Sequence, residues 1–290
     1  MKRITFLLLL AVMLSATAGA LSVRKKSIRK VAQNAQVVPS TDYQRAIDAY
    51  EKDDYATAAQ LMKKHLDKNP NHADAWAYLG AIYSEDNRPE QALTAIDKAR
   101  QCHIDESKTQ MLNWLYFTRS TINLDLNDTI SAIEDLNMAL RYDKTDVDSY
   151  YRRANIYKRL RRYDEAMVDY GMLVQYEPKE VEGYLGIGTV AGSLGKRKDA
   201  IKAYTMAIKL IPDDAEPYAL RAVEYYNDWE FEKAAKDVVS SLERERDNRR
   251  ALWILEYLKQ NENATKDLQK VFKDKAKKTK DPSWLDLLND

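Results

Sequence analysis

Apolar side chains recur along most of the chain at spacings of three, four and seven residues, which is the period of an amphipathic α-helix. Between residues 39 and 248 this pattern itself repeats. Equivalent alanines are 34 residues apart, except for one step of 40 between Ala92 and Ala132. They are Ala58, Ala92, Ala132, Ala166, Ala200 and Ala234. A fixed period of this length predicts an all-α fold of stacked antiparallel helix pairs.

Two further columns keep the same register. The residue 12 positions before each alanine is small, and the residue 16 positions before all but the first alanine is aromatic: Trp76, Tyr116, Tyr150, Tyr184 and Tyr218. Two helices approach closely where both carry small side chains, and the aromatic rings then fill the space between one helix pair and the next. Pro70, Pro178 and Pro212 indicate where three of the second helices end.

A W-x2-L-G-x2-Y run at Trp76, Leu79, Gly80 and Tyr83 resembles the tetratricopeptide repeat family. The resemblance implies a right-handed superhelical solenoid of about six repeats. We place the repeats at residues 39–72, 73–106, 113–146, 147–180, 181–214 and 215–248. An insertion of about six residues is expected before the third repeat, near residues 106–112, because one alanine step is longer than the others. In the first repeat, Asp42 stands where the aromatic residue belongs.

The C-terminal region continues the helical pattern in a weaker form. Residues 249–277 predict a degenerate helix pair, with Leu252, Leu255 and Leu258 on one face of its first helix. Such a pair suits the cap that a solenoid needs at its end. Residues 278–290 form a tail containing Trp284, which either folds back onto the last helices or docks on a partner.

The N-terminus has the pattern of an export signal. Lys2 and Arg3 precede an apolar run over residues 4–14, and small residues end at Ala20 in an A-x-A cleavage pattern. We predict a signal peptide over residues 1–20, cleaved after Ala20, and a periplasmic or secreted mature protein without an integral membrane span. Residues 21–38 form a basic linker, which is either a solvated arm or a contact for anionic lipid or an acidic partner.

Composition narrows the function. The net charge is +1, so no global field directs the chain to nucleic acid. The single cysteine excludes a disulfide framework and a cysteine-rich metal site. His65, His72 and His103 form no H-E-x-x-H pattern, and the glycine-rich segment 186–196 lacks the spacing of a phosphate-binding loop. That segment is predicted to pack closely or to be a soft point of the solenoid. We expect no enzyme activity, no cofactor and no bound metal.

The register predicts a partner-binding surface on the first helices, which the resemblance places on the concave face. Aromatic groups there supply contact area, Asn155 can pair with a peptide backbone, and Lys158 and Arg159 suit an acidic group. Some of the aromatic groups could equally pack between repeats. The candidate residues are Phe117, Thr121, Tyr151, Asn155, Lys158, Arg159, Tyr226 and Asn227. Relatives that grip a C-terminal carboxylate carry Lys, Asn and Arg where this chain has Tyr151, Gly186 and Leu220, so that ligand is not expected.

These inferences predict an exported adaptor or scaffold that binds a protein or peptide partner within a cell-envelope complex. The alternative is an envelope-structural protein that tethers anionic lipid or cell-wall polymer through its basic termini. A third reading, a cryptic hydrolase or an enzyme subunit, lacks a motif. A homo-oligomer is left open, because solenoids can pair through an exposed terminal helix.

Overall fold

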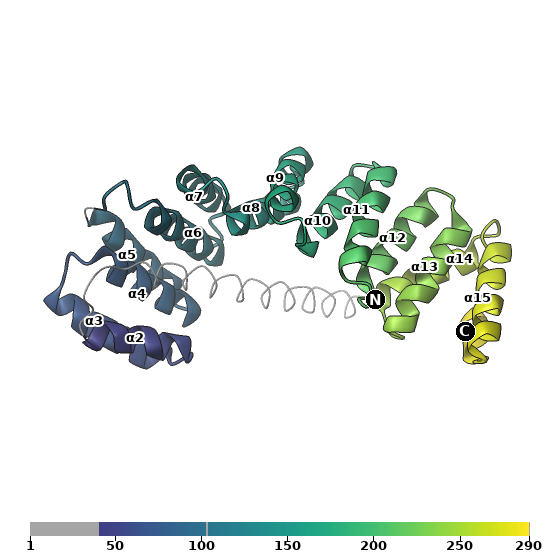
Figure 1. The fold of residues 1–290 in the computed structure, drawn as a ribbon, viewed down its shortest axis with the longest axis horizontal. Helices are drawn as coiled ribbons and strands as arrows, with labels where there is room; N and C mark the ends of the chain where they lie inside the picture. The colour runs from purple at the N-terminus through teal and green to yellow at the C-terminus, as the bar shows by residue number, and fades with distance from the viewer. Residues whose placement is uncertain (1–40, 103, 290) are drawn as a thin grey trace. The chain divides into compact units, whose positions relative to one another are not determined.

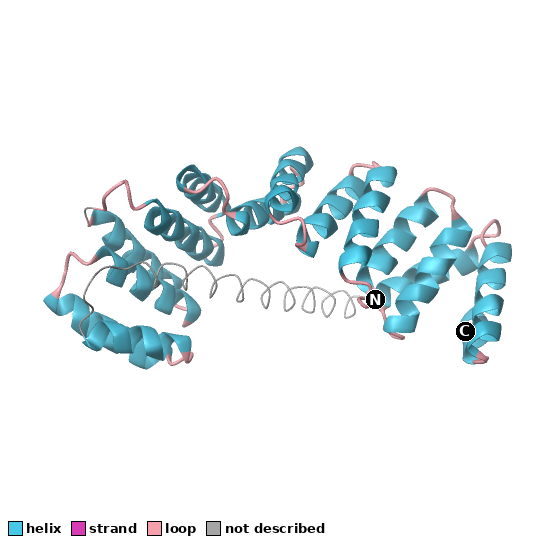
Figure 2. Cartoon of the chain, in the orientation of Figure 1, coloured by secondary structure: helices cyan, strands magenta, loops and turns pink. Residues whose placement is uncertain are grey.

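The computed structural model describes residues 41–102 and 104–289, so the predicted signal peptide, the basic linker and His103 lie outside the described residues. The described part of the chain contains fifteen helices and no strand (Figures 1 and 2). The predicted all-α class of stacked helix pairs is therefore confirmed. The helices form two compact units, one ending at Ser149 and one beginning at Tyr150.

The first unit consists of three helix pairs, within each of which the two helices are in contact. The pairs are α2 (Thr41–Glu51) with α3 (Tyr55–Lys68), α4 (Ala73–Glu85) with α5 (Pro89–Gln101), and α6 (Thr109–Asp125) with α7 (Thr129–Tyr142). The predicted insertion is partly helical, because α6 begins at Thr109 and buries Met111 and Leu112. These two apolar side chains explain why the inserted residues extend the helix rather than form a loop.

The second unit continues the same arrangement; α8 starts three residues before the boundary and lies mostly in this unit. Its elements are α8 (Val147–Arg159), α9 (Tyr163–Tyr176), α10 (Val181–Ser193), α11 (Arg197–Leu210), α12 (Glu216–Asn227), α13 (Phe231–Arg244), α14 (Arg249–Gln260), α15 (Thr265–Thr279) and α16 (Ser283–Asn289).

The turn inside each of the six repeats has one geometry. Three residues separate the two helices, and the middle one adopts a left-handed backbone with φ between 57° and 70°. Only one of these six residues is glycine; they are Asp53, Asn87, Asn127, Arg161, Gly195 and Trp229. Asn and Asp tolerate this conformation better than other L-residues do, whereas Arg and Trp are strained there.

The small-residue column allows the close helix contacts that the sequence predicts. A Cβ placed on Gly80 would lie 2.6 Å from the Ile96 side chain. In α10, a Cβ on Gly186 would lie 2.4 Å from the Tyr170 ring, and one on Gly188 would lie 2.5 Å from the Tyr204 ring. The glycine-rich segment therefore packs closely against aromatic rings, and its predicted softness stays a prediction.

Three rings of the aromatic column join successive repeats, and two stack on a tyrosine of their own repeat. Trp76 Nε1 donates to the carbonyl of Pro70 at 2.7 Å, and the hydroxyls of Tyr184 and Tyr218 donate in the same way to Pro178 and Pro212, each at 3.2 Å. In the third and fourth repeats, where no proline precedes the ring, Tyr116 and Tyr150 instead stack on Tyr142 and Tyr176.

The C-terminal helices α14 and α15 pack against α13 and against each other, and their capping role stays a prediction. Leu255 and Leu258 of α14 are buried together with Leu268 and Phe272 of α15. Of the two fates left open for the tail, the structure shows the first: α16 folds back, with Trp284 only 4% exposed and its ring 6.2 Å from that of Phe272.

Candidate partner-binding site

A polar cluster in the second unit brings together three of the predicted partner-binding residues around a tyrosine of α9. The hydroxyl of Tyr170 donates to Asn155 Oδ1 at 2.9 Å, and Asn155 Nδ2 donates to the backbone carbonyl of Tyr151 at 2.9 Å. The rings of Tyr151 and Tyr170 meet edge to face, 6.5 Å apart. Gly186 also lies closely against the Tyr170 ring. Asn155 is thus oriented by Tyr170, a residue that the sequence reading did not single out.

Lys158 is the cation of this cluster. Its side chain is half-buried, and its Nζ lies 5.8 Å from the centre of the Tyr170 ring. Burial lowers the pKa of Lys158. Among the described residues, no carboxylate lies within ion-pairing distance of its ammonium. A partly desolvated ammonium without a carboxylate partner favours an incoming anionic group.

The remaining predicted residues differ in accessibility. Arg159 and Asn227 are exposed, and Tyr226 is half-buried, with its hydroxyl accepting from Asn261 Nδ2 at 3.3 Å. Phe117 and Thr121 are each 3% exposed and line a small cavity beside Trp114. Their side chains therefore pack the interior of the first unit, and the accessible candidates lie in the fourth and sixth repeats.

Aromatic groups that the sequence reading missed form a cluster with Tyr226, in which Phe231 is buried, while Trp229 and Trp253 contact Phe231 and Tyr257 rather than Tyr226 itself. Trp229 is 70% exposed and Trp253 is 50% exposed. The rings of Phe231 and Tyr257 lie 5.7 and 6.2 Å from that of Tyr226. The available signal was Trp229, an apolar residue at the turn position where other repeats carry Asn, Asp, Arg or Gly.

Three buried ion pairs hold helix pairs together and were also missed. In each pair, an arginine of the first helix donates at least two hydrogen bonds to an aspartate 16 residues later on the second helix. The pairs are Arg119–Asp135, Arg153–Asp169 and Arg221–Asp237. Their sequence signal is the constant spacing, in register with the 34-residue period.

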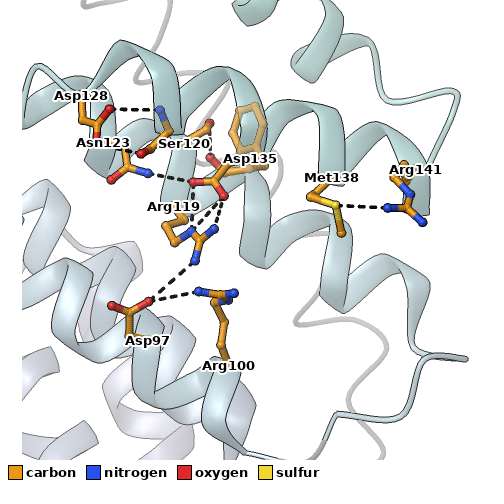
Figure 3. A network of polar contacts seen from close by, with 11 residues as sticks. Asp97, Arg100, Arg119, Ser120, Asn123, Asp128, Asp135, Met138 and Arg141 are labelled. Atoms are coloured by element: carbon orange, nitrogen blue, oxygen red, sulfur yellow. Dashed lines mark hydrogen bonds and ion pairs between the residues drawn. The ribbon is translucent and has the colours of Figure 1, made fainter.

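Figure 3 shows the first of these pairs within a network. Asp135 is 1% exposed and also accepts from Asn123 Nδ2 at 2.8 Å, while Arg119 reaches Asp97 of the preceding repeat at 3.7 Å. Arg221 makes the equivalent link by donating to Thr205 at 2.9 Å. Arg119 and Arg221 therefore connect the third repeat to the second and the sixth repeat to the fifth.

Metal-ligand clusters and membrane-spanning helices were both sought among the described residues. No group of three His, Cys, Asp or Glu side chains is arranged to hold a metal ion in this part of the chain. No helix among residues 41–102 and 104–289 has both the length and the apolar character needed to cross a membrane.

Stacked antiparallel helix pairs with a repeated register define this chain as a helical repeat protein. Sequence profiles described as tetratricopeptide repeat match residues 49–110, 147–180 and 181–214, and no catalytic family is among these matches. Residues 49–110 and 147–214 of this chain are thus identified as tetratricopeptide repeats. A search of curated protein sequences found no match.

Solved structures share the fold at low sequence identity. The C-terminal part of a TPR repeat-containing protein from Cytophaga hutchinsonii is 14% identical, with a TM-score of 0.69 over 85% of this chain and 93% of that one. A tetratricopeptide repeat protein from Parabacteroides merdae is 20% identical, with a TM-score of 0.58 over 87% and 100%. YrrB, described as a TPR protein with an unusual peptide-binding site, is 20% identical, with a TM-score of 0.59 over 68% and 98%.

Proposed function

We propose that this chain is an exported adaptor that binds a protein or peptide partner through the cluster of Tyr151, Asn155 and Lys158 in its fourth repeat. Tetratricopeptide repeat proteins bind protein or peptide partners, and YrrB is described as having a peptide-binding site. The observation that carries the proposal is Lys158, a half-buried ammonium beside an oriented amide, with no carboxylate partner among the described residues.

The chemistry of the cluster suits an extended segment with an acidic group. A carboxylate placed at Lys158 would form a charge-assisted hydrogen bond in a partly desolvated place, which is stronger than the same bond in water. The edge-to-face rings of Tyr151 and Tyr170 would supply a firm apolar contact beside it. Arg159, one residue further and exposed, adds a second positive charge at the rim.

The export part of the proposal rests on the sequence of residues 1–20. Export followed by cleavage after Ala20 would place the adaptor in the periplasm or outside the cell, where it would act within a cell-envelope complex. N-terminal sequencing of the protein isolated from its native cell tests this directly. A mature chain that begins at Leu21 is the expected result, and one that begins at Met1 would refute it.

The binding part is tested with a charge-removing variant and a matched control. Lys158→Gln breaks no ion pair among the described residues, so its helical circular dichroism should match that of the wild type. Lys209→Gln removes an exposed lysine of α11 as the control. We expect one partner to be captured from envelope extract by wild type and control, and to bind Lys158→Gln at least about tenfold more weakly, since a hydrogen bond to a charged group contributes about 1.5–3 kcal/mol.

Equal capture by all three proteins would refute the proposed site. Binding to anionic lipid vesicles that is unaffected by Lys158→Gln, together with no protein partner, would favour the alternative tether through the basic termini.

A further inference from the structure

The second repeat contains a hollow that the function proposed above does not use. It measures about 290 Å³ and lies where three helices of the first unit meet, labelled α3, α4 and α5 in Figure 1. Its floor is apolar, and one lysine from α3 and one from α5 stand at its edge. The residues that matter are Lys63, Trp76, Leu79, Tyr83, Ala95 and Lys98. Its volume is just below the usual range for small-ligand pockets and is enough for one large side chain.

Comparison of the repeats explains why the hollow exists. Leu79 and Ala95 stand 40 residues before Arg119 and Asp135, so they occupy the places that the buried ion pair takes in the third repeat. The fourth and sixth repeats fill these places with an Arg–Asp pair too. In the second repeat a leucine and an alanine stand there, and the smaller side chains leave space above Trp76.

The two lysines give the hollow its charge. Lys98 Nζ lies 4.4 Å from the centre of the Trp76 ring, and Lys63 Nζ lies 5.4 Å from that of Tyr83. Both side chains are exposed, and neither forms an ion pair with a carboxylate of the described residues. Each ammonium is therefore held over an aromatic wall of the hollow while keeping its capacity to bind an anion.

The fifth repeat shows that the lysines do not simply accompany the missing ion pair. It also carries apolar residues at the pair positions, Ile187 and Ala203. At the places of Lys63 and Lys98, however, stand Gly171 of the preceding fourth repeat and Met206 of the fifth. Of the second and fifth repeats, only the second thus combines apolar residues at the pair positions with two cations beside them.

We propose that this hollow is a second binding site, which takes an acidic peptide segment that inserts one large apolar side chain between two carboxylates. The apolar side chain would fill the space over Leu79 and Ala95, and the flanking carboxylates would pair with Lys63 and Lys98. Charge complementarity selects this occupant, because a basic or neutral segment would leave both ammonium groups unpaired. The basic linker of this chain carries the wrong charge for the site.

The test uses the indole signals of ¹⁵N-labelled protein. The chain has five tryptophans, so the indole region of a correlation spectrum contains few peaks, and Trp76→Phe assigns the relevant one. The probe is the acetylated and amidated peptide Glu-Asp-Phe-Asp-Glu. We expect a saturable shift of the Trp76 signal, with a Kd at least tenfold lower than for Lys-Arg-Phe-Arg-Lys and for Glu-Asp-Ala-Asp-Glu.

A variant copied from the other repeats provides the sharpest control. Leu79→Arg/Ala95→Asp places the ion pair of the third repeat in the hollow and should abolish the shift. The matched variant Ile187→Arg/Ala203→Asp makes the same change in the fifth repeat and should bind the peptide as the wild type does. Lys63→Gln/Lys98→Gln alters exposed residues only and should raise the Kd at least tenfold, which keeps the test valid if the filled variant fails to fold.

The proposal is overturned if the acidic peptide binds no better than the basic one, or if the folded Leu79→Arg/Ala95→Asp variant still binds it. Lys158→Gln should leave this titration unchanged, so failure of the fourth-repeat site and failure of this one are distinguishable.

Discussion

The buried pair Arg221–Asp237 offers the sharpest test of how this chain holds its repeats together. Arg221 donates to both carboxylate oxygens of Asp237, at 2.7 and 2.8 Å, and the side chains are 16% and 7% exposed. Burial raises the pKa of Asp237, and the hydrogen bonds from Arg221 oppose this shift. In the fifth repeat the same two places hold Ile187 and Ala203, so the chain itself supplies an apolar replacement.

Removal of one partner and replacement of both should have very different effects. In Asp237→Ala, the largely buried guanidinium of Arg221 keeps only Thr205 as an acceptor among the contacts described above. Loss of one member of a buried ion pair lowers the free energy of unfolding by about 3–5 kcal/mol. Because Arg221 retains some exposure, we expect a value near the lower end, about 3 kcal/mol. Arg221→Ile/Asp237→Ala removes both charges, and we expect its stability to lie within about 1 kcal/mol of wild type. The coupling free energy would then be about 2 kcal/mol or more.

Urea unfolding followed by far-ultraviolet circular dichroism measures these differences, and hydrogen exchange of α12 and α13 localises them, since repeat arrays need not unfold in a single step. The reverse experiment introduces an ion pair into the fifth repeat with Ile187→Arg/Ala203→Asp. Ile187→Arg alone should be far more destabilising than this double substitution. If Arg221→Ile/Asp237→Ala is as unstable as Asp237→Ala, the pair is not a replaceable unit and the reasoning fails.

Three further predictions concern the left-handed turns, the histidine pair and Tyr170. Gly195→Ala should lower the free energy of unfolding by about 1 kcal/mol and Arg161→Gly should raise it by up to about 1 kcal/mol, because both residues occupy the left-handed turn position. Thermal unfolding measures both changes, and a stabilising Gly195→Ala or a destabilising Arg161→Gly would contradict the reasoning. His65 Nε2 and His72 Nδ1 lie 2.7 Å apart, and burial lowers the pKa of both below the ordinary 6.5. Their contribution to stability is therefore present above pH 6.5 and lost as the pH falls through the lowered folded-state values, so melting temperatures of wild type and of His65→Gln/His72→Gln should converge in acid. Tyr170→Phe removes one hydrogen bond, should cost about 1 kcal/mol in urea unfolding and should weaken partner binding, whereas unchanged binding would show that Tyr170 does not orient the site.

The repeat fold was predictable because steric contact controls the residues that reveal it. Gly80 must stay small since Ile96 lies against it, and Trp76 must reach the carbonyl of Pro70. Each requirement recurs once per repeat, so it appears in the sequence as a column. The start of α6 at Thr109 was not predictable from the period, because the inserted residues have no counterpart in other repeats.

The candidate site was predictable only in part. The helical register placed Tyr151, Asn155 and Lys158 on one helix, but it could not show that Tyr170 of the next helix holds the amide. It also placed Phe117 beside them as an accessible group, whereas this side chain is 3% exposed. A register gives the direction of a side chain from its own helix, and burial depends on what the neighbouring helices place against it.

The two positions in each repeat that hold an Arg–Asp pair elsewhere bear on both the stability of the fold and the second binding site proposed above. Where an Arg–Asp pair fills them, as in the fourth and sixth repeats, its two side chains join the two helices of the pair. Where Leu79 and Ala95 fill them, the fold is kept by apolar contacts and a hollow opens over Trp76. Since both solutions occur within one solenoid, the chain can exchange a structural contact for a binding surface one repeat at a time. In the second site proposed above, the apolar residues at these two positions act together with Lys63 and Lys98, because Ile187 and Ala203 of the fifth repeat lack such cations.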